Sequence, residues 1–329
     1  MAHVVSVIIV AFNQKEMLLE TIDSLLKQTY PDLEIIVVDN NSMDGTSDLI
    51  KTERPQVSYI KSEVNLGFAG GNNLGLEHSS GEYIALLNSD AVAQADWLEA
   101  LTAAMDTHPD VGICASKMIA FGTEVIDSAG DGFSTILKGF KRGEGESPAL
   151  YDTEEYIFGA CAGAALYRRK MLDEIGFLDE DFFLIHEDTD LNFRAQLTGW
   201  KVLYVPKAIV YHKVRSTIGN MSDVAIYHTL RNCEFVRLKN IPLVVFLGCL
   251  PAYIFGAIAD FFYFAVRHRK LKLYFNAKSD AVKMMKMMCG KRKKIMTMKR
   301  GEDKYLYRMM TPVWSREFFS AKAKKFFGN

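Results

Sequence analysis

A chain of 329 residues with 49% hydrophobic and 24% charged residues can bury one sizeable core, so intrinsic disorder is not its expected state. Its five cysteines are scattered, odd in number and without CxxC spacing. This pattern argues against a disulfide framework or a zinc site and fits a reducing compartment.

The net charge of -1 conceals three segments of different character. Residues 1–240 hold 20 Lys and Arg against 35 Asp and Glu, whereas residues 267–329 hold 19 against 4. Between them, residues 241–266 carry a single charge, that of Asp260. We therefore predict two parts, an acidic body over residues 1–240 and an apolar and basic helical extension over residues 241–329.

Strands and helices alternate through the first third of the chain. Continuous β-branched runs are typical of strands buried on both faces, and apolar residues at helical spacing predict amphipathic helices. The expected strands are 4–10, 33–38, 57–60 and 83–87, and the expected helices are 15–27, 69–78 and one beginning near Asp44. The apolar N-terminus lacks the basic region and cleavage site of an export signal, so it is interpreted as the first strand. Repeated β-α-β units imply right-handed crossovers and an open sheet that binds ligands at the carboxyl ends of its strands.

The middle of the chain is less regular. The Gly-rich, polar stretch 122–155 predicts a hairpin and a mobile loop. After it, a strand is expected over 156–167, a helix over 188–197 and a strand over 202–205.

Small or polar residues follow three of the expected strands, at 11–13, 39–42 and 88–90. Ordinary polar loops would explain them, but three such edges in register favour a binding site. Asp39 ends the second strand, where it can accept hydrogen bonds from a ribose or a base. Alternatively, it caps the helix that follows.

The segment 65–75 is rich in glycine and opens a helix. Glycine allows the backbone to approach a ligand closely, and a helix N-terminus attracts phosphates. The segment lacks the Gly-Lys-Ser/Thr of a Walker loop and the spacing of GxGxxG, so an ordinary tight loop stays possible.

Two further patterns suggest metal binding and proton transfer. Asp90, in the segment 88–90 after a very hydrophobic strand, can hold Mg²⁺ or Mn²⁺, unless that segment is only a turn. Glu187, Asp188 and Asp190 place three acids in four residues, more than the capping of a helix requires, so one is a candidate general base. His212 ends the run 204–211; a lone histidine is more often structural than a metal ligand.

Together and in this order, these segments resemble the family 2 glycosyltransferases, which have a GT-A type fold, and within them the rhamnosyltransferase-like branch. The resemblance covers about residues 4–240 and depends on the order and context of the motifs. The motifs are 7–13, 39–42, 65–75, 87–90, 167–169, 176–183, 187–188 and the run to His212.

The resemblance implies a role for each matching position. Asp90 corresponds to the retained carboxylate of a DxD-type metal motif, Asp188, in the Glu187-Asp188 motif, to the catalytic base, and His212 to a second metal or diphosphate contact. The implied donor pocket consists of Ala11, Asn13, Asp39, Asn65, Gly70, Gly71, Asn72, Asn88 and Ser89. Two positions depart from the pattern: Asn88 replaces the first acid of the metal motif, and His186 precedes the Glu-Asp pair.

We therefore expect an α/β protein with an open, mostly parallel GT-A type sheet, acting as an inverting glycosyltransferase. The donor would be a nucleotide diphosphate sugar, with rhamnose as one candidate, and the acceptor a lipid-linked or surface glycan. Two alternatives stay open: a non-catalytic, membrane-associated scaffold that binds a sugar nucleotide, and a sugar-nucleotide nucleotidyltransferase. The second would need a basic Gly-rich loop after the first strand, and residues 11–14 supply none.

The apolar segment 241–266 is long enough to span a bilayer, but Pro251 and Asp260 count against a clean span. The basic residues that follow should be attracted to an anionic membrane surface. We expect peripheral or re-entrant attachment at the cytoplasmic face of the cell membrane, ahead of a true span or a buried core element. Nucleic-acid binding is not expected, because the aromatic residues of the tail lie in amphipathic patterns.

Overall fold

The computed structural model describes residues 3–213 and 222–315. The strands are β1 Val5–Ala11, β2 Leu33–Asp39, β3 Ser58–Lys61, β4 Tyr83–Leu87, β5 Ala91–Ala93, β6 Val111–Ala120, β7 Ile126–Ser128, β8 Asp131–Ser134, β9 Lys138–Lys141, β10 Glu155–Ile157, β11 Ala164–Arg168 and β12 Lys201–His212. The helices are α1 Lys15–Leu25, α2 Thr46–Glu53, α3 Gly67–Glu77, α4 Trp97–Thr107, α5 Arg169–Ile175, α6 Glu187–Thr198, α7 Asp223–Asn240, α8 Leu243–Asp260, α9 Leu271–Lys283, α10 Met285–Met298 and α11 Asp303–Met309. Two short 3-10 turns, η1 Pro148–Leu150 and η2 Glu180–Phe182, and a π-helical segment, η3 Phe261–Arg267, complete the described elements.

One large mixed sheet has the strand order β10-β12-β6-β11-β4-β1-β2-β3. Strands β4, β1, β2 and β3 are parallel, as are β6 and β12, whereas β11 runs antiparallel between β6 and β4. The register places Ala11 opposite Asp39, so the carboxyl ends of β1 and β2 meet at one edge. The expected open, mostly parallel sheet flanked by helices is confirmed.

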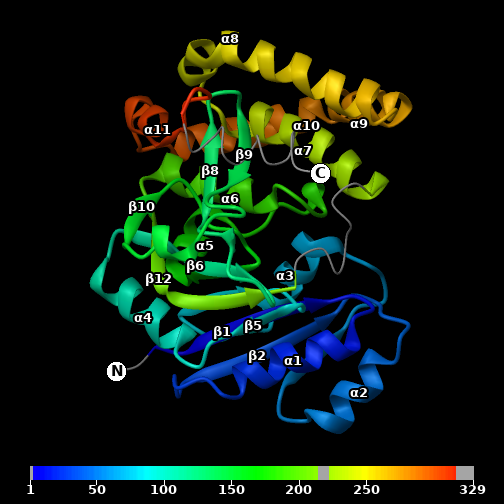
Figure 1. Cartoon of the computed structure of the whole chain (residues 1–329), viewed down its shortest axis with the longest axis vertical. Coiled ribbons are helices and arrows are strands. Elements are labelled where there is room, and N and C mark those ends of the chain that lie inside the picture. The colour runs from blue at the N-terminus through cyan, green and yellow to red at the C-terminus, as the bar shows by residue number, and fades with distance from the viewer. Residues whose placement is uncertain (1–2, 214–221, 316–329) are drawn as a thin grey trace.

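The helices cover both faces of the sheet (Figure 1). Side chains of β1 alternate between the two faces, as the pleat of a strand requires. Val7 and Ile9 belong to the hydrophobic cluster that includes residues of α1 and α4, and Ile8 belongs to the cluster that includes residues of α3, α5 and α6. These alternating, fully buried β-branched residues explain why the first strand reads as a continuous apolar run.

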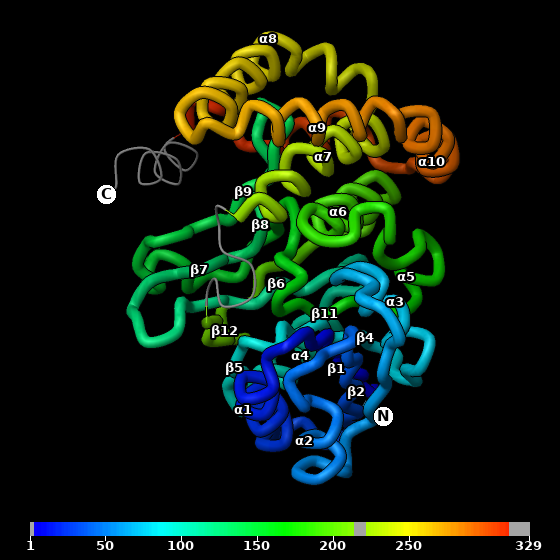
Figure 2. The backbone as a smooth tube through the Cα atoms, turned by 90° about the vertical axis from the view of Figure 1, so that its right-hand side faces the viewer, coloured from blue at the N-terminus to red at the C-terminus, as the bar shows by residue number. Residues whose placement is uncertain are grey.

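The C-terminal helices form a third layer on top of the body (Figures 1 and 2). A further hydrophobic cluster joins Phe133 of β8 and Phe193 of α6 to Val245 of α8, Met288 of α10 and Leu306 of α11. The extension is helical, as expected, and it shares a core with the body. The boundary at residue 240 stays a prediction.

The strand expected over 156–167 is wrong as one element. It is interrupted between β10 and β11 by the loop 159–163, whose backbone groups bond elsewhere. Gly159 exchanges two backbone hydrogen bonds with Asp131, and the Asn192 side chain bonds both the amide and the carbonyl of Ala160. Apolar composition alone does not show that these partners exist.

The expected strand 202–205 is too short, since β12 continues to His212. Its pairing with β6 shifts between Val205 and Ile209, and this irregularity accommodates Pro206 inside a long strand. Both β6, which lies inside the sheet, and α4 were not predicted from the sequence.

Candidate active site

Asp90 and His212 meet at the carboxyl ends of β4 and β12. Strand β5 pairs antiparallel with β12 and sets Ala91 opposite His212, which brings Asp90 beside the imidazole ring. Asp90 Oδ1 lies 3.2 Å from His212 Nε2, and Asp127 Oδ2 lies 2.8 Å from His212 Nδ1. Lys141 Nζ donates to Asp127 at 2.8 Å, so four side chains form one chain of contacts.

The surroundings of His212 stabilise a positive charge. Burial alone would lower the pKa of His212, but its hydrogen bonds to Asp127 and Asp90 raise it to about 9. Burial would likewise raise the pKa of Asp127, yet His212 and Lys141 lower it to about 2. The carboxylate oxygens of Asp90 and the ring nitrogen Nε2 of His212 are groups of the kind that bind divalent metal ions in proteins.

The loop 159–163 links this centre to Asp188. The amide of Asn88 donates to the carbonyl of Gly163 at 2.9 Å, and the amide of Ala162 donates to Asp188 Oδ2 at 3.4 Å. Asn88 Nδ2 also lies 3.4 Å from His212 Nε2. The structure therefore brings together Asn88, Asp90, His212 and Asp188, four of the residues singled out in the sequence, and their roles stay a prediction.

Three carboxyl groups share the other end of the site: Glu187 and Asp188 in the first turn of α6, and Asp131 at the start of β8. Burial and the charge of Asp188 raise the pKa of Glu187 and of Asp131 well above their ordinary values. Glu187 Oε2 is buried and has no hydrogen-bond partner among the described residues. Asp188 is the more accessible of the α6 pair.

Asp190 has a structural role, and this removes it as an alternative base. It is fully buried, with Arg194 Nε at 2.8 Å, Lys239 Nζ at 2.7 Å and Asn240 Nδ2 at 2.7 Å. Burial would raise the pKa of Asp190, but the charges of Lys239 and Arg194 lower it to about 2. Its carboxylate joins α6 to the end of α7.

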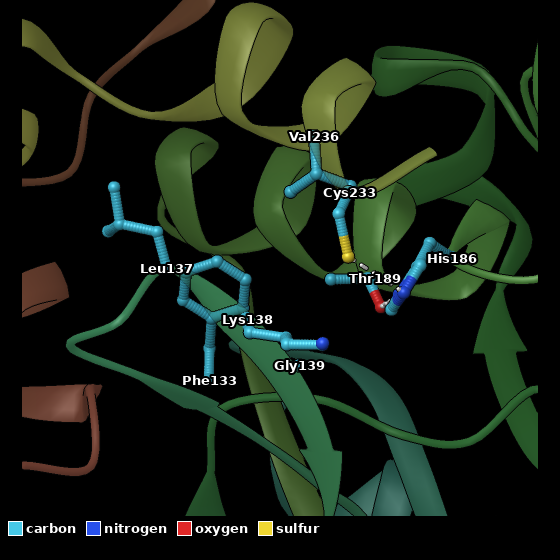
Figure 3. A pocket seen from close by; sticks show the side chains of 8 residues that line it. All are labelled: Phe133, Leu137, Lys138, Gly139, His186, Thr189, Cys233 and Val236. Carbon is cyan, nitrogen blue, oxygen red and sulfur yellow. Dashed lines mark hydrogen bonds between the residues drawn. The ribbon is translucent and has the colours of Figure 1, made fainter. Parts of the chain in front are cut away.

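His186 lies between Cys233 and Thr189, and Figure 3 shows the three side chains pointing toward one another. His186 Nε2 is 3.2 Å from Cys233 Sγ, and its Nδ1 is 3.2 Å from Thr189 Oγ1. The Thr189 hydroxyl in turn donates to Asp188 Oδ1 at 3.3 Å. Burial opposes ionisation of the Cys233–His186 pair, but each charge supports the other, so the pKa of Cys233 falls to about 6 and that of His186 rises. His186, the residue that departs from the family pattern, therefore contacts the candidate base through Thr189.

The predicted nucleotide residues gather around the ends of β1 and β2. Asp39 is fully buried and accepts hydrogen bonds from the Ser42 amide, at 2.8 Å, and from the Tyr59 hydroxyl. Asn13, with a φ of 54°, accepts from the Met43 amide at 2.8 Å. Asp39 thus shapes the turn after β2 without capping α2, whose first residue is Thr46.

The glycine-rich segment has a packing role that sequence reasoning did not identify. A side chain at Gly71 would meet Val10 of β1 at 2.8 Å, and one at Gly70 would meet Leu66 at 2.9 Å. Asn65 Oδ1 accepts from the amide of Gly67, and Asn72 bonds the carbonyl of Phe68 within α3. Gly71 therefore allows the close approach of α3 to β1, and the assignment of Gly70 and Gly71 to the donor pocket stays a prediction.

The remaining predicted residues lie at the same edge. Ala11 is fully buried in β1 opposite Asp39, and the Ser89 hydroxyl donates to Gln14 Oε1 at 3.2 Å. Sequence reasoning missed Asp127, Asp131, Lys141 and Gln14 as site residues. Asp127 and Asp131 lie among apolar and small residues in 125–133. These two isolated charges were the sequence feature that could have indicated both residues as part of the site.

Solved structures identify the class of the fold. A mannosyltransferase from Pyrobaculum calidifontis, in complex with GDP-Man and Mn²⁺, matches with a TM-score of 0.57 and 16% identity over 99% of this chain and 88% of that chain. The S. aureus protein TarS (residues 1–349), in complex with UDP-GlcNAc, matches with a TM-score of 0.57 and 19% identity over 93% of this chain and 90% of that chain. The fold is that of the GT-A glycosyltransferases.

A family model described as glycosyl transferase family 2 matches residues 6–176, more than half of the chain, and the protein belongs to that family. It is 24% identical over 221 residues to a poly-beta-1,6-N-acetyl-D-glucosamine synthase of Staphylococcus epidermidis, covering 66% of this chain and 52% of that protein. It is 28% identical over 220 residues to the amylovoran biosynthesis glycosyltransferase AmsB of Erwinia amylovora, covering 64% of this chain and 69% of that protein. The chain spans about half the length of the first of these relatives.

Proposed function

We propose that this protein is an inverting glycosyltransferase that moves a sugar from a nucleotide diphosphate donor to an acceptor hydroxyl by direct displacement. The observation that carries the proposal is the loop 159–163, which contacts Asn88 beside the Asp90–His212 pair and also contacts Asp188. In direct displacement, the leaving group departs from one side of the sugar and the acceptor hydroxyl attacks from the other. The loop contacts groups suited to stabilising the leaving group and to deprotonating the acceptor hydroxyl.

The Asp90–His212 pair fits a divalent metal, Mg²⁺ or Mn²⁺. Asp90 offers a carboxylate oxygen and His212 offers Nε2, while Asp127 bonds the opposite ring nitrogen, as the partners of metal-bound histidines do. No cluster of three or more His, Cys, Asp or Glu able to hold a metal occurs within residues 3–213 and 222–315, so the diphosphate and water would complete the coordination. When bound, the metal would neutralise charge on the departing nucleotide diphosphate.

Asp188 would accept the proton of the acceptor hydroxyl. Its two neighbours, Glu187 and Asp131, have raised pKa values, so each favours the protonated form next to the Asp188 charge. His186 and Thr189 would hold the orientation of the Asp188 carboxylate. Glu187 would act with Asp188 as part of the same motif.

The donor's nucleoside would bind at the ends of β1 and β2. Two hydrogen bonds hold the buried Asp39 and leave acceptor positions on its carboxylate; contact with a ribose or a base would require the turn over it to open. Asn13, Asn65 and Asn72 line or support the same edge of the sheet.

We propose a lipid-linked or surface-glycan acceptor at the cytoplasmic face of the cell membrane. A relative from Escherichia coli, 42% identical over 89 residues that make up 27% of this chain and 36% of that protein, is named as a glucosyltransferase acting on a GlcNAc-diphosphoundecaprenol. In the described part of the chain, one helix, Leu243–Arg267, is long and apolar enough to cross a membrane. Only 17% of the 18-residue apolar stretch within this helix is buried. That exposure disfavours a soluble core element and supports attachment to an anionic membrane surface.

The test is release of nucleoside diphosphate from a panel of rhamnose, glucose, N-acetylglucosamine and mannose nucleotides, with and without Mn²⁺ and a lipid-linked acceptor. We expect release that depends on both. Binding of a donor without any release would favour a non-catalytic scaffold, and release of pyrophosphate would favour a nucleotidyltransferase.

Asp90→Ala should weaken the Mn²⁺-dependent binding of the nucleoside diphosphate, measured by calorimetry, because it removes one of the two protein ligands. Asp106→Ala is the matched control: Asp106 bonds Tyr83 at the opposite end of β4. Unchanged metal dependence in Asp90→Ala would contradict the assignment.

A further inference from the structure

Helix α8 lies along the surface of the protein with one face inward and the other exposed. Its inward face carries Val245, Cys249 and Gly256, and a side chain at Gly256 would meet Ile136 at 2.9 Å. Asp260, the one charge in the apolar segment, forms an ion pair with Lys138 of β9 at 2.7 Å. The outward face exposes Leu243, Val244, Leu247, Ile254, Phe255 and Ile258, and Phe262 of η3 is exposed beside it.

This arrangement fits a helix lying in the plane of a membrane interface. A helix that crossed the bilayer would need its carboxylate partnered in the hydrocarbon, whereas Asp260 is partnered by the body of the enzyme. An apolar outer face opposite a face packed on the body is the pattern of a helix that lies in the interface.

The apolar surface continues around the turn into α9. Phe261 contacts Tyr274 and Phe275 of α9, with ring centroids 5.5 and 6.4 Å apart. Val266, Leu271 and Phe275 are each at least half exposed. The segment from the end of η3 through the turn into the start of α9 is strongly basic, reading Arg-His-Arg-Lys-Leu-Lys over 267–272.

A cavity of about 240 Å³ opens at this turn. Its lining includes Arg269, Lys270, Lys272, Asn276 and Asp223. Lys270 pairs with Asp223 at 2.6 Å, whereas the side chains of Arg269 and Lys272 have no ion pair or hydrogen bond within residues 3–213 and 222–315. The cavity therefore carries two cations in excess of its single carboxylate.

The cavity also lies at the start of α9. No side chain caps the first turn of this 13-residue helix, and Lys272 and Leu273 of that turn line the cavity. A free helix N-terminus attracts anions, and so do the two unpaired cations. A water molecule takes about 30 Å³ in the liquid, so the cavity has room for a phosphate group.

We propose that this cavity binds the phosphate of an anionic membrane lipid while the outward face of α8 and the adjoining residues of η3 and α9 enter the interface. The inference rests on the membrane attachment proposed above and adds a defined headgroup site to it. Free phosphate has the same chemistry, but the exposed apolar residues beside the cavity favour a phosphate that carries acyl chains.

The test is sedimentation of the full-length protein with vesicles of phosphatidylcholine, alone or mixed with phosphatidylglycerol. Arg269→Gln/Lys272→Gln should lower the affinity for the mixed vesicles about 25-fold, since each cation at an anionic surface contributes about a factor of five. The matched control is Lys293→Gln/Lys294→Gln on α10, which removes two exposed cations outside the cavity and should change the affinity less than about threefold.

Equal losses in both double variants, or wild-type protein that binds neither vesicle, would overturn the headgroup site. A thermal shift of the wild type with inorganic phosphate, absent in Arg269→Gln/Lys272→Gln, together with vesicle binding that the substitution does not change, would assign the cavity to a free phosphate instead. Calorimetry with the nucleoside diphosphate and Mn²⁺ separates the two proposals, because both double variants should bind it like the wild type. Absence of that binding in all proteins would refute the proposed function and leave the vesicle result standing.

Discussion

The body and the C-terminal helices use charged and apolar side chains in opposite ways. In the body, carboxylates such as Asp190 and Asp127 are buried and paired with cations, so that their charges fix the positions of neighbouring elements. In α8 and α9, large apolar side chains point outward and two cations at the turn are unpaired among the described residues. The difference teaches that buried, paired charges hold the protein's own elements in position. Exposed apolar surface, by contrast, indicates where a membrane or another molecule binds.

The largest effect should come from Asp188→Asn, which removes the candidate base and keeps its shape. Turnover should fall by about 10²- to 10⁴-fold, as is typical for loss of a general base, while donor binding stays. Steady-state turnover and donor calorimetry measure the two quantities. Wild-type turnover in this variant would transfer the role of base to Glu187.

Asp190→Asn tests whether the buried charges of the body are structural. Breaking this network leaves Lys239 and Arg194 buried without their carboxylate, and the free energy of unfolding should fall by about 3–5 kcal/mol. Urea unfolding measures it, with Asp48→Asn on the exposed face of α2 as the control. Folded Asp190→Asn protein that loses turnover as completely as Asp188→Asn would contradict the structural role.

The same network predicts a pH dependence. Because the folded-state pKa of Asp190, about 2, lies below its ordinary value of 3.8, its stabilising contribution is present above pH 3.8 and is lost as the pH falls toward 2. The stability difference between wild type and Asp190→Asn should therefore shrink over this range.

The smallest effect concerns the outward apolar face. Phe262→Ser should lower vesicle affinity about fivefold, because roughly half of this side chain's area would otherwise be buried in lipid, and leave the free energy of unfolding nearly unchanged. Val64→Ser, at a comparably exposed apolar residue on the body, is the control and should have no effect on vesicle binding. If the full-length protein stays wholly in the soluble fraction when it is mixed with membranes at low salt, the membrane proposal is wrong. The exposed face of α8 would then be assigned to a contact with another protein.

The regular elements of the first third of the chain could be predicted from the sequence, because burial on both faces leaves continuous apolar runs. The limits of β4 agree residue for residue, and those of β1 and α6 agree to within one residue. The interrupted strand could not be predicted, since its interruption depends on Asp131 and Asn192, which are distant in the chain. Apolar pattern does not encode such partners.

The candidate site, like the fold, could be predicted only in part. Family resemblance led to Asp90, Asp188 and His212, and the fold brings all three to one edge of the sheet. Asp127 was missed because it lies outside every motif and its contact in the site is with His212, 85 residues away in the chain. The packing role of Gly71 could not be predicted, because a glycine needed for helix–sheet packing looks the same in sequence as one needed for a ligand.

The irregular loop 159–163 has a consequence for how accurately the site is built. A strand would have been positioned by its neighbours in the sheet, with the regular spacing of the ladder. Here the carbonyl of Gly163 and the amide of Ala162, adjacent in the chain, bond Asn88 on one side and Asp188 on the other. The two halves of the reaction centre are therefore held at most two residues apart along the chain, so the reach of a dipeptide limits how far they can separate.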